Sequence, residues 1–363
     1  MDLITQGVLG AAVGMVGWRH KMGRPAILAG ALFGLLPDLD VVAGLAGQWA
    51  SMVHHRGISH ALVFAPVMAW PFGAIAWKAA GAWRARRPGL ESGYLSWVHL
   101  AFWAMWTHPL LDAFTSYGTQ LYLPFSSTRV AWDGVSIVDP LYTFPLIGAL
   151  IASWFFRERA GMGRKVTALA LGWTVAYLGL GMWQNHRAVS WGQAQFERQF
   201  DRPAEHLRAL PTLANLFAWR IVAREEDLTV HAAQHSNLEP RALKFYTMRP
   251  PKGPEGELDE RIVKVQEDPR GDLFLWFADD YVSYDFFPHE GGTRLRMSDQ
   301  RYGGIQRPIH AMWGAEAFFD EAGELQDIQR YNDRSGMDIG AEFSGIWSLI
   351  WTGRVRPPKA SAP

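Results

Sequence analysis

The chain carries histidines and carboxylates at spacings that suit metal ligation. The stretch HHRGISH, residues 54–60, holds three histidines and an arginine directly before an apolar segment. His108 and Asp112 are four residues apart, so both side chains project from one face of a helix. Asp38 and Asp40 flank one residue after a proline, where an extended turn can aim both carboxylates the same way. Since the chain has no cysteine, a metal site here would use only nitrogen and oxygen ligands.

Within the histidine-rich stretch, His55 and His60 are the stronger ligand candidates. They are five residues apart, which is too far for one face of a regular helix, and Gly57 lets the chain turn between them. Ser59 is expected to cap the helix that His60 begins. Of the neighbours His54 and His55, only one is expected to bind a metal directly.

Taken together, these residues suit one divalent ion, or two ions that share a bridging carboxylate. Zn²⁺ is the favoured metal for mixed nitrogen and oxygen ligands, with Mn²⁺, Fe²⁺ and Mg²⁺ as alternatives. The predicted metal ligands are Asp38, Asp40, His55, His60, His108 and Asp112. Two further residues are predicted to take part in catalysis. Asp139 would act as a general base or orient a ligand, and Arg56 is either an interfacial arginine or a clamp for an anionic group.

The elements that must position these residues are long apolar segments. They run over residues 3–18, 25–47, 61–77, 95–111, 140–156 and 166–183. A membrane span needs roughly 20 mainly apolar residues, and the last four segments come near that length. The first two are short or are interrupted by Asp38 and Asp40. We therefore expect an α-helical multi-spanning membrane domain of about five to six helices over residues 1–185; a large buried helical core is the alternative.

Basic residues gather in alternate connections between these segments. Residues 19–24, 78–87 and 157–165 hold 11 of the 13 Lys and Arg that precede residue 186. The positive-inside rule places these connections in the cytoplasm. All the candidate ligands then fall at the opposite, outer end of the helices, together with the C-terminal half of the chain. In a Gram-negative bacterium, that outer side of the inner membrane is the periplasm.

From about residue 186 the chain is charged and rich in strand-like alternation, as in LTVHA and TRLRMSD. We expect a soluble α+β domain with a mainly antiparallel sheet over residues 186–355, followed by a disordered tail at 356–363. Four histidines in this half lack ligand spacing and are expected to be structural or at the surface: His231, His235, His289 and His310.

With these residues in view, the chain resembles the YdjM-like family of bacterial inner-membrane proteins, whose metal-dependent hydrolase activity is itself largely inferred. The matching stretches are MDLITQGVLGAAVG, LPDLD, HHRGISHAL, HPLLDAFTSYGTQLYLPFS and VDPLYTFP, which cover most of residues 1–150 in the family's order. The resemblance implies a membrane-embedded metal site. Many relatives open with LTH where this chain has Gln6, so either Gln6 is a weaker neutral ligand or the ligand set differs.

The sequence as a whole therefore predicts a membrane-bound metal-dependent hydrolase. A site at the outer membrane interface favours an amphiphilic substrate, such as a phospholipid or a lipid-linked phosphoester. A formal net charge of zero argues against a nucleic-acid partner. Two other classes fit the same residues. An ion or proton pathway would carry polar residues through the full depth, whereas the inner halves of these segments are apolar. A structural or regulatory protein would use the metal only to hold helices together.

Overall fold

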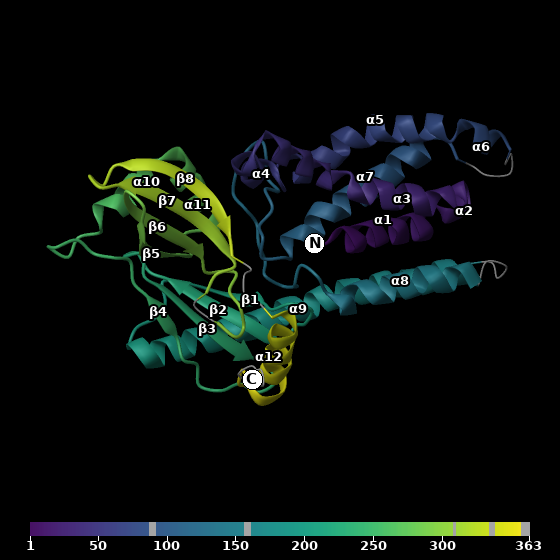
Figure 1. Cartoon of the computed structure of the whole chain (residues 1–363). Helices are drawn as coiled ribbons and strands as arrows, with labels where there is room; N and C mark the ends of the chain where they lie inside the picture. Colours follow the sequence, from purple (N-terminus) through teal and green to yellow (C-terminus); the bar gives the residue numbers. More distant parts are fainter. Residues whose placement is uncertain (87–91, 156–160, 308–309, 334–337, 357–363) are drawn as a thin grey trace, which may run out of the picture. The chain divides into compact units, whose positions relative to one another are not determined.

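The computed structural model describes residues 1–86, 92–155, 161–307, 310–333 and 338–356 (Figure 1). The chain divides into two compact units. A helical unit comprises Met1–Trp183 with Leu213–Asn215, and a β unit comprises the rest, from Gln184 onward. Three basic residues of the predicted cytoplasmic connections, Arg87, Arg157 and Arg159, lie outside the described residues, as does the predicted tail beyond residue 356.

The helical unit is built from α-helices joined by short 3₁₀-helices. Its elements are α1 (Leu3–Gly17), α2 (Arg19–Met22), α3 (Pro25–Leu35), the 3₁₀-helix η1 (Pro37–Ala46), α4 (Gln48–His54), the 3₁₀-helix η2 (Ile58–His60), α5 (Phe64–Ala79), α6 (Gly81–Ala85), α7 (Tyr94–Ala113), α8 (Pro140–Phe155) and the first part of α9 (Met162–Phe200). Asp2 caps α1, because its carboxylate accepts a hydrogen bond from the Thr5 backbone N–H at 3.0 Å. The long loop between α7 and α8 contributes no helix among the described residues.

Glycines let α1 and α3 pack with their backbones in contact. Gly10 and Gly14 are four residues apart on α1, and Gly30 and Gly34 repeat that spacing on α3. A Cβ atom on Gly10 would lie 2.2 Å from the carbonyl oxygen of Gly30, and the reverse distance is also 2.2 Å. Any side chain at these positions would force the helices apart. The close approach places the start of α1 against the end of α3, where the polar residues are.

The helices α3, α5 and α7 belong to one bundle (Figure 1) and share an apolar core. Phe33, Ala65, Ala101 and Met105 are all nearly inaccessible to solvent and pack into it. Six of its twelve buried members are alanines, and a Cβ atom on Gly73 of α5 would lie 2.8 Å from the Cα atom of Val98 on α7, so these two helices also approach closely. The core fixes the position of the C-terminal end of α7, which carries His108.

Two described helices are long and apolar enough to cross a membrane, Pro25–Ala46 and Met162–Phe200. A third span is possible if Gln48–His60 and Phe64–Ala79, which meet at a 77° bend, count as one. The predicted five to six spans are therefore not confirmed. The physical reason lies in helix length: the 15 residues of α1 cover about 22 Å, less than the roughly 30 Å hydrocarbon core of a bilayer.

The β unit contains two four-stranded antiparallel sheets where the sequence predicted one. The strands follow chain order in both: β1 (His206–Pro211), β2 (Ala218–Arg224), β3 (Val230–Ser236) and β4 (Tyr246–Met248), then β5 (Val282–His289), β6 (Gly292–Asp299), β7 (Trp313–Asp320) and β8 (Leu325–Asn332). Its helices are the second part of α9, α10 (Glu260–Glu267), α11 (Pro269–Ala278) and α12 (Ile339–Thr352). The predicted antiparallel pairing is confirmed throughout.

Candidate metal centre

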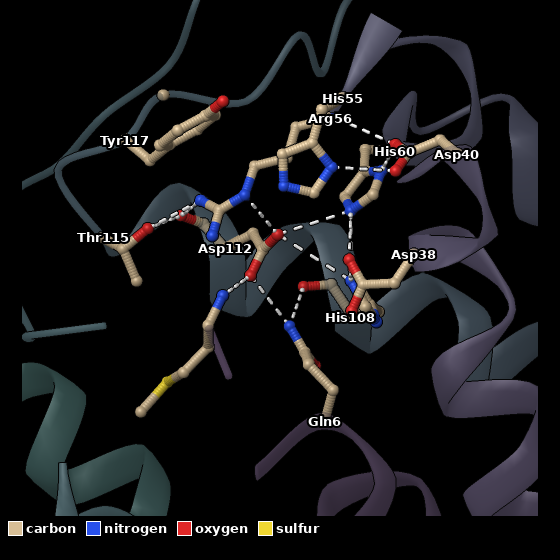
Figure 2. Close-up of polar contacts among 12 residues, drawn as sticks. Gln6, Asp38, Asp40, His55, Arg56, His60, His108, Asp112, Thr115 and Tyr117 are labelled. Atoms are coloured by element: carbon tan, nitrogen blue, oxygen red, sulfur yellow. Dashed lines mark hydrogen bonds and ion pairs between the residues drawn. The ribbon is translucent and has the colours of Figure 1, made fainter. Parts of the chain in front are cut away.

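Histidine and carboxylate side chains from three separate segments meet at one end of the helical unit (Figure 2). Pro37 begins a 3₁₀-helix after α3, and this turn carries Asp38 and Asp40. His60 ends the short η2 turn, and His108 with Asp112 lie on the last two turns of α7. The sequence predicted only that these residues lie at the same end of the helices. In the folded chain their ligand atoms lie within a few ångströms of one another.

The first donor set consists of His60, His108, Asp38 and Asp112, whose ligand atoms all lie within 4.8 Å of one another. The two Nε2 atoms of the histidines are 3.1 Å apart. Asp38 Oδ1 lies 3.5 Å from the first and 3.4 Å from the second. Asp112 Oδ2 lies 3.4 Å and 3.8 Å from the same two atoms. A tetrahedral Zn²⁺ with bonds near 2.0–2.1 Å needs ligands roughly 3.3–3.4 Å apart, and these five distances lie close to that spacing.

The protons on the two imidazoles can be assigned from their other neighbours. His108 Nδ1 lies 2.5 Å from the carbonyl oxygen of Gly34, which can only accept, so Nδ1 carries the proton. His60 Nδ1 lies 3.1 Å from Asp40 Oδ2, which likewise accepts. In the neutral rings, both Nε2 atoms therefore present lone pairs toward each other and toward carboxylate oxygens. Three of these four electron-pair donors are buried and Asp38 is partly exposed, an arrangement that a cation between them would stabilise.

A second donor set, formed by Asp38, Asp40 and His55, lies next to the first and shares Asp38 with it. His55 Nδ1 is 2.8 Å from Asp40 Oδ1. Asp40 Oδ2 accepts hydrogen bonds from the Arg56 backbone N–H at 2.8 Å and from Ser59 Oγ at 2.9 Å. The expectation that Ser59 caps a helix is therefore wrong: its hydroxyl binds Asp40, and the next α-helix begins only at residue 64.

The predicted anion clamp Arg56 is turned toward Asp112. Its side chain is only 3 % exposed, and Nε lies 2.9 Å from Asp112 Oδ2. Nη1 donates to Thr115 Oγ1 at 2.8 Å, and the guanidinium lies over the Tyr117 ring. The backbone of Arg56 is left-handed (φ 59°), a conformation that directs its N–H to Asp40. In this geometry Arg56 orients and neutralises Asp112; contact with a substrate anion stays a prediction.

Gln6 and the amino group of Met1 complete the surroundings of Asp112. Gln6 Nε2 donates to Asp112 Oδ1 at 2.9 Å and to the His108 carbonyl oxygen at 3.2 Å. The Met1 amino group forms an ion pair with the same carboxylate. The amide oxygen of Gln6 is buried and has no hydrogen-bond partner among the described residues. Sequence comparison with the family's LTH opening had already identified Gln6 as a candidate site residue. No sequence spacing, however, linked Thr115 or Tyr117 to the site.

Asp139 lies in a different network. Its two carboxylate oxygens each accept from the Tyr177 hydroxyl at 3.0 Å, and Oδ1 also accepts from the Leu141 backbone N–H. Within the described ranges, neither donor set includes it. His54 is exposed and also lies outside both sets, while its neighbour His55 belongs to the second. The catalytic role predicted for Asp139 is thus left without a contact to the metal ligands.

Apolar helices long enough to span a bilayer and a buried His/Asp cluster at one end define a membrane protein with a candidate metal centre. Residues 1–188 match the sequence profile of the family described as YdjM inner membrane protein. The chain therefore belongs to the YdjM inner membrane protein family, as the motifs in its first half predicted.

One curated relative, the "Uncharacterized protein YfhP" of Bacillus subtilis (strain 168), is 28% identical to this chain over 184 residues. That alignment covers 47% of this chain and 50% of the relative, so the match spans about half the length of each protein. No solved structure matches the chain significantly. The β unit lies mostly beyond the residues that the family profile matches.

Proposed function

We propose that this protein is a membrane-bound metal-dependent hydrolase, with the His60–His108–Asp38–Asp112 set as its principal metal site. The observation that carries the proposal is the pair of Nε2 atoms 3.1 Å apart. Each can offer a lone pair to a metal, because an acceptor oxygen lies at the Nδ1 atom of the same ring. Zn²⁺ is the metal that best suits two imidazoles with two carboxylates; Mn²⁺, Fe²⁺ and Mg²⁺ are the alternatives.

The second donor set supports a second ion next to the first. Asp38 belongs to both sets, so its carboxylate is the natural bridge between two ions. When bound, such ions would acidify water and polarise a scissile ester or phosphoester bond. The chain's own residues would hold this centre in place. Asp40 keeps the proton on His60 Nδ1, Gly34 does the same for His108, and Arg56 orients Asp112.

An amphiphilic substrate, such as a phospholipid or lipid-linked phosphoester, is the favoured class because the candidate ligands lie at helix ends in a membrane protein. Apolar residues near the donor sets are exposed, including Leu39 and Leu45 on η1, at 57% and 91%. Such residues provide a surface for acyl chains. The basic connections support an outer, periplasmic orientation of this end and of the β unit in a multi-pass protein of the bacterial inner membrane.

Metal content tests the site directly. We expect detergent-purified protein to contain stoichiometric metal by elemental analysis, and His60→Ala and His108→Ala to reduce it to background. His54→Ala is a matched control one residue from the second donor set, and it should keep full metal content. Full retention in His60→Ala would overturn the assignment. His55→Ala tests the second ion: it should lower the metal content from two equivalents to one.

Hydrolytic activity needs a separate measurement because a structural metal would give the same content. We expect the purified protein to cleave lipid phosphoesters in mixed micelles, and Asp38→Asn to abolish cleavage. Stoichiometric metal that resists mild chelation, without activity on any such ester, would instead favour a structural or regulatory centre. Proton flux through proteoliposomes containing metal-free protein would favour a pathway, since a proton can also occupy the space between the two Nε2 atoms.

The orientation can be tested with single cysteines because the natural chain has none. Ser127→Cys lies in the exposed loop at the donor-set end, and Ala85→Cys lies at the exposed end of α6. An impermeant maleimide applied to spheroplasts should label the first and not the second. The reverse pattern would contradict the proposed orientation.

A further inference from the structure

The helical unit has a second feature that the candidate metal centre does not explain, a cavity of about 610 Å³ between α1, α3, α8 and the start of α9. Because α1 and α3 are antiparallel, with Gly10 against Gly30 and Gly14 against Ala26, this cavity lies at the other end of both helices from Gln6 and Asp38. It is far too large for a single ion and has the size of a small ligand or a lipid headgroup.

Three arginines line the cavity: Arg19, Arg24 and Arg164. The Arg24 guanidinium lies 4.3 Å from the centre of the Trp154 ring, which also lines the cavity. Burial, together with the positive charge of Arg24, lowers the pKa of the Arg19 guanidinium. Within the part of the chain that the structure describes, no carboxylate forms an ion pair with any of the three. Arg19 and Arg24 therefore repel each other without a compensating described anion, and Arg164 adds a third positive charge to the same wall.

Apart from His20 and Ser153, the rest of the cavity wall is apolar. Leu28 and Leu150 line it beside the arginines, and Leu28 is 65% exposed. A wall of this kind gains free energy when hydrocarbon covers it. Cationic side chains next to an apolar surface between membrane helices match the two parts of an anionic phospholipid, its phosphate and its acyl chains.

We propose that this cavity binds a phosphate-bearing anion, which the guanidinium groups of Arg19, Arg24 and Arg164 hold. Two sources share this chemistry, a phospholipid headgroup and free phosphate. The site is separate from the metal centre, and the proposal does not depend on hydrolase activity. A bound lipid would fill the space between four helices and reduce the repulsion among the arginines.

Binding by the full-length protein in detergent tests the proposal. Calorimetric titration would compare short-chain phosphatidylglycerol, phosphatidylcholine of the same chain length, and inorganic phosphate. We expect the triple variant Arg19→Gln/Arg24→Gln/Arg164→Gln to weaken binding of the anionic probe by about 10-fold or more, since each basic side chain near a lipid phosphate contributes substantially. The corresponding triple lysine variant keeps the charge but loses the planar guanidinium groups, so it should bind more weakly than wild type and more tightly than the glutamine variant.

The matched control is Lys78→Gln/Arg84→Gln/Arg86→Gln, which removes three positive charges at residues that do not line the cavity. It should change binding by less than about twofold. Metal content reports whether each variant is folded. Phosphatidylglycerol binding without phosphate binding would identify a lipid as the source; phosphate binding lost in the glutamine variant would identify free phosphate. Three results would overturn the proposal. They are equal losses of binding in the cavity variant (Arg19→Gln/Arg24→Gln/Arg164→Gln) and in the control variant, unchanged binding in the cavity variant, and no anion binding by the wild-type protein.

Discussion

The helical unit and the β unit both bury two histidines, but the surroundings of those histidines differ. His60 and His108 are 0% exposed, and His231 and His235 are 2% exposed. In the β unit each ring has at least one partner of its own: Glu225 and Thr247 for His231, and Asn237 for Nε2 of His235. Nδ1 of His235 is buried without a hydrogen-bond partner among the described residues, but no carboxylate or second imidazole converges on it there. Burial alone therefore does not distinguish the pairs.

What distinguishes the helical pair is convergence. His60 Nε2 and His108 Nε2 face each other and the same two carboxylates, whereas His231 Nε2 faces the single carboxylate of Glu225. A ring with its own acceptor is complete without an ion. The lone pairs of His60 Nε2 and His108 Nε2, in contrast, face each other and carboxylate oxygens, so in the neutral rings they repel one another unless a cation lies between them. The arrangement of donors, rather than their burial, is thus the sign of a metal centre.

The largest expected difference between the two pairs is in metal content. His108→Ala removes a proposed ligand of the first donor set, and we expect at least a 100-fold loss of metal affinity, since each ligand contributes several kcal/mol. His235→Ala in the β unit should leave the metal content unchanged. Elemental analysis after dialysis against a metal buffer measures both. Loss of metal in His235→Ala alone would reverse the comparison.

The next effect concerns Arg56, which compensates the buried charge of Asp112. Arg56→Gln should destabilise the metal-free protein by up to about 3–5 kcal/mol, because it removes one of the two cations, Arg56 and the Met1 amino group, that compensate the buried Asp112 carboxylate. Added metal should recover part of this loss, since the cation takes over the compensation. Thermal unfolding in detergent, with and without metal, measures the effect. A loss that metal does not reduce would separate Arg56 from the centre.

A third prediction tests how the helices position the site. Gly30→Ala places a Cβ atom 2.2 Å from the Gly10 carbonyl oxygen, so we expect a destabilisation of about 2–3 kcal/mol and weaker metal binding. Gly172→Ala is the control, since nothing lies within 4 Å of a Cβ atom there. That variant should be neutral or gain up to about 1 kcal/mol from helix propensity. Equal stability of the two variants would show that α1 and α3 are not closely packed.

The smallest effect is a pH dependence in the β unit. Burial lowers the pKa of His235 from 6.5 to about 4. Below about pH 6.5 the unfolded chain takes up a proton that the folded chain does not, so stability falls as the pH is lowered from 6.5 toward 4. At pH 5 the loss relative to pH 7 should be about 2 kcal/mol. His235→Gln should remove this loss, whereas the exposed His289→Gln should keep it; urea unfolding at both pH values provides the measurement.

Much of the helical unit could be predicted from local patterns. The i,i+4 spacing of His108 and Asp112 put both side chains on one helix face, and both belong to the first donor set. The proline before Asp38 and Asp40 predicted an extended turn, whereas a 3₁₀-helix begins there and carries both carboxylates. Alternating hydrophobicity predicted the antiparallel strands. The number of spans was harder to predict, because apolar composition does not say where a helix ends.

The sequence by itself determined which residues could form the site, because periodicity and proline fix the face and the end of a helix that a side chain occupies. Only the tertiary structure decided which of them meet. It joined Asp38 to both donor sets, turned Arg56 onto Asp112 and left Asp139 with Tyr177. The reason is that distances between segments depend on how closely α1, α3 and α7 pack. That packing depends on contacts such as Gly10 with Gly30, which no single segment contains.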